Sequence, residues 1–229
     1  MKRFYKEAHV GESGDGFEVL LDGRPIRTPA RNRFVLPTRA LADGVADEWA
    51  AQEEKVDRAA MPLTRMAGTA LDGLAGRREE TRAAVARFAE TDMVCYWADQ
   101  PQRLIERQQA AWRPLLDWTE ERFGARLGVT SGLRPVDQPP AALAALSSVV
   151  SSYDDYRLVA LSIAAGTASS LVIGLALVER RIDAAGAFEA AQVDESFQIE
   201  EWGEDVEATR RRDAVRAELG HVQRLIDAL

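Results

Sequence analysis

The sequence has very little of the chemistry on which many enzymes depend. Its 229 residues include one cysteine, Cys95, and two histidines, His9 and His221, which lie far apart in the chain. One cysteine cannot form a disulfide within a chain, and zinc sites and thiol nucleophiles normally need clustered or paired Cys and His residues. We therefore expect no disulfide, no metal site and no thiol catalysis, and the lone cysteine favours a reducing compartment.

Basic residues are also in deficit. Lys and Arg number 29 against 37 Asp and Glu, which gives a net charge of −8 and a pI near 5.0. This balance argues against binding to a phosphate backbone, so we expect no nucleic-acid partner.

Strongly apolar runs are missing as well. No apolar run follows the basic residues at the amino terminus, so no secretory signal is expected. Residues 158–178 carry no charge and are long enough to span a bilayer, but many of them are Ala, Ser or Gly. We interpret this stretch as a buried central helix whose small residues let neighbouring helices approach, and we expect no membrane insertion.

Cofactor motifs are absent too. There is no dinucleotide fingerprint, no phosphate loop and no Gly-x-Ser-x-Gly elbow. Gly11, Gly14 and Gly16 do not form a phosphate loop, because neither a helix nor a Lys-Ser/Thr pair follows them. We expect no cofactor and no catalytic residue.

The first forty residues have the pattern of a small antiparallel sheet. Asp22-Gly23 is a strong hairpin signal between two β-prone runs. The expected strands cover residues 4–10, 17–21, 24–28 and 33–36.

A helical pattern begins at Thr38, which can cap the first helix, and continues to the end of the chain. The sequence thus predicts an α+β protein with a β-rich N-terminal domain containing one helix, residues 1–60, and an all-α domain, residues 61–229. The expected helical stretches cover residues 38–55, 62–74, 77–97, 101–123, 139–151, 153–178, 183–202 and 206–229.

The tryptophans mainly indicate core positions. Trp49 repeats the spacing of Leu41 and Val45, and Trp112 lies in an apolar part of its helix, where Pro114 predicts a break or a kink. We expect the segment around Cys95, with Asp92, Tyr96 and Trp97, to be buried; an exposed end that binds a ligand is the alternative.

Residues 194–207 form a distinctive acidic segment that contains no basic residue. Its seven carboxylates are Asp194, Glu195, Glu200, Glu201, Glu204, Asp205 and Glu207.

Within this segment, Glu195, Gln198, Ile199 and Trp202 are spaced i, i+3, i+4 and i+7 and would share one helix face. In one interpretation Ile199 and Trp202 belong to the core and the polar residues form its margin. In another, the face is an exposed recognition surface, where a carboxylate pairs with a partner's Arg or Lys beside an aromatic anchor. A third interpretation, two carboxylates acting as acid and base, lacks a pocket partner in the sequence.

Six segments, in this order, resemble the assembly chaperones of the soluble catalytic sector of ATP synthase, which hold the unassembled α subunit. They are DGRPIRTP (22–29), EWAAQ (48–52), MPLTRMAGTALD (61–72), TDMVCYWAD (91–99), QQAAWRPLLDW (108–118) and DESFQIEEWGED (194–205). The chain departs from the family pattern at Gly68, Trp97 and Ala168.

The resemblance implies a β-rich domain joined to a larger helical domain, and an activity without catalysis or ATP hydrolysis. Such chaperones cover the surface of the α subunit that later meets the β subunit and so prevent aggregation. An acidic residue of the last segment is functionally important in the family, and by its position it looks like Glu195.

The resemblance therefore favours a client-binding face made of Glu195, Gln198, Ile199 and Trp202. Because no Arg- and Ser-rich extension precedes Phe4, we expect a bacterial cytoplasmic protein. The alternatives are a small-molecule enzyme that uses acidic residues and an adaptor or structural subunit that stays in the assembled enzyme.

Overall fold

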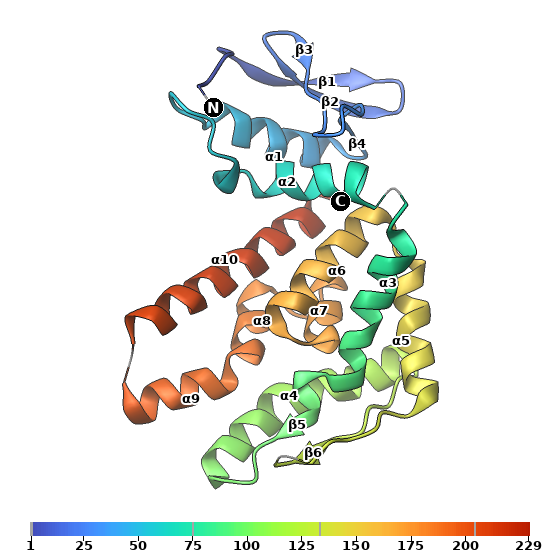
Figure 1. The fold of residues 1–229 in the computed structure, drawn as a ribbon, viewed down its shortest axis with the longest axis vertical. Helices are drawn as coiled ribbons and strands as arrows, with labels where there is room; N and C mark the ends of the chain where they lie inside the picture. Colours follow the sequence, from blue (N-terminus) through green and yellow to red (C-terminus); the bar gives the residue numbers. More distant parts are fainter. Residues whose placement is uncertain (1, 75, 133, 204) are drawn as a thin grey trace. The chain divides into compact units, whose positions relative to one another are not determined.

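The computed structural model describes most of the chain as two compact units (Figure 1). The first unit is Met1–Arg78 with Arg224–Leu229, and the second is Glu79–Gln223. This division differs from the predicted domain boundary between residues 60 and 61. The described residues are 2–74, 76–132, 134–203 and 205–229.

The N-terminal unit contains the predicted antiparallel sheet, but its first strand covers Ala8–Ser13 rather than residues 4–10. Strand β2 pairs with each of the other three strands, and all the pairings are antiparallel. The turn between β2 and β3 places Asp22 and Gly23 at φ values of 48° and 78°, in the left-handed region that Asp-Gly hairpin turns require. The predicted hairpin is thereby confirmed. The strands are β1 (Ala8–Ser13), β2 (Gly16–Leu21), β3 (Arg24–Pro25) and β4 (Val35–Leu36).

Helix α1 (Arg39–Ala50) packs against β1 and β2; it begins where the sequence predicts but ends at Ala50 rather than at residue 55. The hydroxyl of Thr38 accepts a hydrogen bond from the Leu41 backbone N–H at 3.2 Å. At about 100° per residue, Glu48 lies about 20° from Leu41 around the helix, whereas Trp49 lies about 80° away. Glu48 is accordingly buried and Trp49 is half-buried, so the prediction that Trp49 belongs to the core is wrong.

Helix α2 (Pro62–Gly68) and the π-helical turn Thr69–Gly73 follow α1 and belong to the same unit. The buried carboxylate of Glu48 accepts hydrogen bonds from the backbone N–H groups of Leu63 at 2.8 Å and Thr64 at 2.9 Å. These bonds join α2 to α1, and this is why the first unit extends well past residue 60.

The end of the chain returns to the N-terminal unit. The hydroxyl of Thr38 donates a hydrogen bond to the backbone carbonyl of Ala228. Arg224 lies 3.9 Å from a carboxylate oxygen of Glu48. These contacts explain why the last residues group with the sheet rather than with the helices that precede them.

The second unit consists mainly of helices, as the sequence predicts, with one short parallel strand pair. Three 3₁₀ turns, Arg58–Ala60, Arg87–Thr91 and Met93–Cys95, are found along the chain. The remaining elements are α3 (Arg78–Ala86), β5 (Tyr96–Trp97), α4 (Gln102–Phe123), β6 (Thr130–Ser131), α5 (Pro140–Ser152), α6 (Asp155–Ala168), α7 (Leu171–Val178), α8 (Ala184–Ala191), α9 (Val193–Trp202) and α10 (Val206–Asp227).

The uncharged stretch 158–178 is not one helix, so that prediction is wrong. The chain breaks at Ser169, whose φ is 50°, and Ser170 caps α7 by accepting a hydrogen bond from the Ile173 N–H at 3.0 Å. Helices α6 and α7 then pack against each other. A Cβ on Gly174 would lie 3.0 Å from the backbone nitrogen of Ala165, so the expected close approach of helices through small residues does occur. No helix in the described part of the chain is both long and apolar enough to cross a membrane.

Three other helix predictions need correction. The stretch 77–97 is not one helix, because α3 ends at Ala86 and 3₁₀ turns and β5 follow. The stretch 183–202 divides at Gln192 into α8 and α9. Of the break or kink predicted at Pro114, the break does not occur, because α4 is continuous from Gln102 to Phe123. The burial of Trp112, Leu115 and Leu116 around this proline opposes the cost of its missing hydrogen bond.

In the segment around Cys95, Asp92, Cys95 and Trp97 are buried, as the sequence predicts, whereas Tyr96 is half-buried. Asp92 and Cys95 are both 0% exposed. Burial, helped by the charge of Asp92, raises the pKa of Cys95 to about 12, so the side chain is a neutral thiol. Asp92 accepts hydrogen bonds from the backbone N–H groups of Val94 at 3.2 Å and Val172 at 3.0 Å, and it thereby joins this segment to the start of α7.

Candidate functional site

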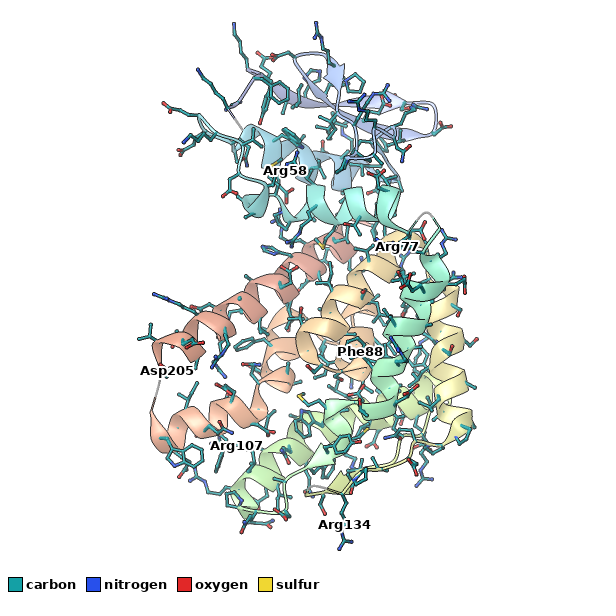
Figure 2. All side chains as sticks on the ribbon, viewed as in Figure 1. Arg58, Arg77, Phe88, Arg107, Arg134 and Asp205 are labelled. Atoms are coloured by element: carbon teal, nitrogen blue, oxygen red, sulfur yellow. The ribbon has the colours of Figure 1, made fainter. Side chains whose placement is uncertain are left out.

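One side of α9 is bound to α4. Phe197 is buried, and the guanidinium groups of Arg103 and Arg107 lie 5.9 and 5.4 Å from the centre of its ring. The carboxamide of Gln108 donates a hydrogen bond to Asp194 at 2.7 Å. Figure 2 labels Arg107, on the α4 side of α9, and Asp205, at the start of α10.

Two acidic residues of α9 complete this attachment. Arg107 forms a bidentate pair with Glu200, with one N···O distance of 2.8 Å. Arg103 contacts Glu201 at 3.0 Å. The hydrogen bond from Arg107 holds the pKa of Glu200 below its usual value. These pairs fix the rotation of α9 about its own axis, because a bidentate guanidinium–carboxylate pair is directional.

Two more acids of the segment stabilise the beginning of α10. Asp205 accepts a hydrogen bond from the backbone N–H of Ala208 at 3.3 Å, and Glu207 pairs with Arg211 at 3.1 Å. Glu204 lies outside the described residues. Among the acids of this segment that the structure describes, only Glu195 has neither a hydrogen bond nor an ion pair for its side chain. Most of the described carboxylates of this segment thus have a partner within the chain, although those of Glu200, Glu201 and Glu207 remain exposed to solvent.

The opposite side of α9 carries the four residues that the sequence groups together. Glu195, Gln198, Ile199 and Trp202 fall within about 100° of one another around the helix, facing away from Phe197. Trp202 is 79% exposed, Gln198 is exposed, and Glu195 and Ile199 are half-buried. The interpretation of Trp202 as a core residue is therefore wrong. We call these four residues the α9 outer face.

Exposed apolar side chains are concentrated at one end of this face. Val206, at the start of α10, is 69% exposed. Within the described residues, the other large hydrophobic side chain with such exposure is Phe4 of the N-terminal unit, at 63%. Burial of an indole against another surface removes a large apolar area from water, so Trp202 and Val206 together present apolar area at this end of α9.

Trp112, by contrast, is structural. It is 1% exposed, and its indole N–H donates a hydrogen bond to the backbone carbonyl of Ala190 at 2.8 Å. This confirms the prediction that Trp112 belongs to the core. The bond ties α4 to the end of α8, immediately before α9 begins.

The arrangement gives no support to acid–base catalysis. Two hollows of the described structure lie in the N-terminal unit, and neither is lined by Asp194 or Glu195. No group of three or more His, Cys, Asp and Glu residues in the described ranges is placed to hold a metal ion.

Sequence reasoning missed the residues that orient the α9 outer face, namely Arg103, Arg107 and Gln108. The i, i+4 spacing of the two arginines was a usable signal, because two cations one turn apart can face adjacent carboxylates on a neighbouring helix. Their partners lie 86 to 98 residues further along the chain, so the sequence alone could not identify them.

Comparisons with known proteins agree on one family. The family model described as "ATP12 chaperone protein" matches residues 2–120, a range that ends within α4. The mitochondrial protein atp12 of Schizosaccharomyces pombe is 21% identical over an alignment of 214 residues, and the match covers 88% of this chain and 74% of that protein.

Solved structures are similar over nearly the whole chain. Atp12 from Paracoccus denitrificans is 37% identical with a TM-score of 0.94, and the match covers 99% of this chain and 97% of that one. The Atu1473 protein from Agrobacterium tumefaciens is 39% identical with a TM-score of 0.92, and the match covers 99% and 85%.

Proposed function

The chain belongs to the ATP12 chaperone protein family, and on this premise we propose that it binds the unassembled α subunit of ATP synthase. It shields the surface of the α subunit that later meets the β subunit and prevents aggregation until the catalytic sector assembles. The protein acts in the cytoplasm, without ATP hydrolysis, a cofactor or catalysis.

The observation that carries this proposal is the exposure of Trp202 beside the unpaired Glu195 on the α9 outer face. An indole contributes a large apolar area at a small cost in side-chain entropy, and aromatic anchors of this kind dominate many protein interfaces. A neighbouring carboxylate adds orientation, because it favours an Arg or Lys of the client and repels an acidic surface.

A chaperone that yields its client without ATP must bind with limited affinity. Release then depends on competition by the β subunit for the same client surface. A dissociation constant of about 1 μM corresponds to a binding free energy of roughly −8 kcal/mol, and a few anchor residues can supply most of it. A small outer face on one helix is in keeping with an interaction of that size.

The proposal is tested by mixing the purified chain with isolated α subunit in the absence of nucleotide. We expect a co-eluting complex at micromolar concentrations, lower light scattering from the α subunit, and loss of the complex when β subunit is added. Failure to form a complex would refute the proposal. Recovery of the chain in stoichiometric amount from mature ATP synthase would instead support an adaptor or structural subunit.

Reversing the charge of Glu195 should weaken this complex. For Glu195→Lys we expect roughly tenfold weaker binding, because the lysine repels the cationic client group that the carboxylate attracts. Glu121→Lys is the matched control, since Glu121 is exposed on α4 and has no ion pair with another described residue. Circular dichroism and the melting temperature should be unchanged in both variants. A large loss of stability in Glu195→Lys would show that Glu195 is structural.

Removing the indole of Trp202 should have a larger effect on binding. We expect Trp202→Ala to weaken the complex roughly 10- to 100-fold, as loss of an aromatic anchor does, with little change in stability because the side chain is 79% exposed. Phe4→Ala is the control for general loss of exposed aromatic surface. Equal losses of affinity in the two variants would contradict a specific role for Trp202.

A further inference from the structure

The N-terminal unit contains a groove that the proposed function does not use. Its volume is about 530 Å³, within the range of ligand-binding clefts. We call it the arginine groove, because Arg27, Arg58, Arg65 and Arg77 all line it and all are exposed. Figure 2 labels Arg58 and Arg77.

The shape of the arginine groove follows from the helix that forms its long wall. Its lining positions on α2 and the following π-helical turn recur every three or four residues from Met61 to Gly73. At about 1.5 Å per residue, this face is roughly 16–18 Å long. An extended chain advances about 3.3 Å per residue, so the wall matches a segment of about five residues better than a compact small molecule.

The opposite wall is a loop that Asp72 holds in place. Its carboxylate accepts hydrogen bonds from the Thr28 hydroxyl at 2.6 Å, the Ala30 N–H at 2.8 Å and the Asn32 carboxamide at 2.7 Å. Desolvation opposes ionisation of Asp72, but these three bonds outweigh it and hold its pKa below the usual value. The one carboxylate of the groove lining is thus engaged with the loop.

The rim of the groove is cationic although the chain as a whole carries a net charge of −8. Arg58 and Arg77 form no ion pair with any other described residue, and Arg27 donates to the backbone carbonyl of Arg31 at 3.1 Å rather than to a carboxylate. Guanidinium groups bind carboxylates bidentately and desolvate readily, so this rim favours an acidic ligand.

The floor of the groove is apolar. Phe34 and Met61 are buried, and Gly68 leaves space beside them. A Cβ on Gly68 would lie 3.8 Å from the Phe34 ring and 3.9 Å from Pro29, which are ordinary contact distances. The backbone of Gly68 is helical, with φ −61° and ψ −37°, so a larger residue is sterically possible and would fill the groove.

We propose that the arginine groove binds an extended acidic segment of a client polypeptide, about five residues long. An apolar side chain of the segment packs on Phe34 and Met61 while its carboxylates pair with the arginines of the rim. This contact does not require the client to be the ATP synthase α subunit, so a synthetic peptide can test it separately from the proposed function.

The probe is the capped peptide acetyl-Glu-Leu-Asp-Leu-Glu-amide, titrated into the isotope-labelled full chain and followed by backbone amide resonances. We expect saturable shifts at residues 27–34 and 61–73, with a dissociation constant of about 10–100 μM, and binding that weakens as salt concentration rises. The neutral peptide with Gln and Asn in place of Glu and Asp should bind at least tenfold more weakly. No saturable shift up to about 1 mM, or equal binding of the neutral peptide, would overturn the proposal.

Two variants locate the binding in the groove. Gly68→Leu, which blocks the floor, and the pair Arg58→Glu with Arg77→Glu, which reverses the rim charge, should each reduce peptide affinity at least tenfold. The pair Arg134→Glu with Arg210→Glu is the matched control, because both arginines are exposed outside the groove, neither forms an ion pair with another described residue, and the net charge changes by the same amount. An unchanged affinity in the two groove variants, with native circular dichroism, would refute this location.

Other occupants would also be revealed. Competition by glutarate or phosphate at concentrations equal to that of the peptide would indicate a small-anion site and overturn the peptide proposal. A dimer that Gly68→Leu converts to a monomer would show that a second copy of the chain occupies the groove, with the same consequence.

Discussion

Replacing Asp92 with alanine is expected to lower the free energy of unfolding by about 3 kcal/mol at neutral pH. Asp92 is 0% exposed, and its carboxylate accepts backbone hydrogen bonds from Val94 at 3.2 Å and Val172 at 3.0 Å. Alanine leaves these N–H groups buried without an acceptor and opens a small cavity. Urea unfolding monitored by circular dichroism measures the effect.

The contribution of Asp92 to the free energy of unfolding should also depend on pH. Burial raises its pKa to about 6, from 3.8 for a free side chain, although hydrogen bonds from Ser170, Val172 and neighbouring N–H groups oppose the shift. Between these two values the folded chain holds a proton that the unfolded chain has released. The contribution of Asp92 to the free energy of unfolding therefore falls by roughly 2–3 kcal/mol as pH rises from about 4 to above 6. Acidification to about pH 4 restores it.

The variant Asp92→Asn, whose side chain does not titrate, separates the effect of Asp92 ionisation on stability from other effects of pH. The stability difference, wild type minus Asp92→Asn, should increase as pH falls from 7 to 4, because acid effects common to both proteins cancel. Asp117→Asn, at an exposed position of α4, is the control and should differ from wild type by less than about 0.5 kcal/mol at every pH. A difference between wild type and Asp92→Asn that is constant over this range would show that Asp92 does not titrate there.

Asp92 also illustrates which parts of the fold the sequence could predict. The Asp22-Gly23 turn and the Thr38 cap depend on residues within a few positions of each other, so their signals are local. The start of α7 depends partly on a carboxylate 80 residues earlier in the chain. No local pattern contains that partner, although the Ser170 cap at the break between α6 and α7 is itself a local signal, which the uncharged run 158–178 obscures.

The candidate site shows the same limit. Helical spacing correctly places Glu195, Gln198, Ile199 and Trp202 on one face of α9. Whether that face is exposed depends on Arg103 and Arg107 of α4, which bind the other side of the helix. Composition likewise made the acidic segment seem uniformly available, whereas most of its described carboxylates have partners within the chain. Spacing thus predicts which residues share a face, and long-range contacts decide which face a client can reach.

The arginine groove had no sequence signature at all. Its arginines lie between residues 27 and 77 with no regular spacing, and they converge only because the 27–34 loop is held against the end of the α2 segment by Asp72. The position of α2 in turn depends on the hydrogen bonds that Glu48 accepts. The same contacts that stabilise the N-terminal unit therefore also shape the arginine groove.

Replacing Glu48 with alanine should therefore affect both stability and binding. The Glu48 carboxylate is buried and accepts hydrogen bonds from the Leu63 N–H at 2.8 Å, the Thr64 N–H at 2.9 Å and the Thr64 hydroxyl at 2.9 Å. These are orphan donors at the start of a helix, where a carboxylate is also favoured by the helix dipole. We expect Glu48→Ala to lower the free energy of unfolding of the N-terminal unit by about 3–4 kcal/mol.

Hydrogen exchange distinguishes this capping role from general destabilisation. In Glu48→Ala the amides of Leu63 and Thr64 should lose protection first, and affinity for the acidic peptide should fall because Met61 and Gly68 no longer hold the groove in shape. Glu53→Ala, which removes an exposed glutamate just after α1, should change neither property. Unchanged protection at Leu63 and Thr64 in Glu48→Ala would contradict the capping role. Loss of stability with intact peptide binding would instead show that the groove does not depend on the attachment of α2 to α1.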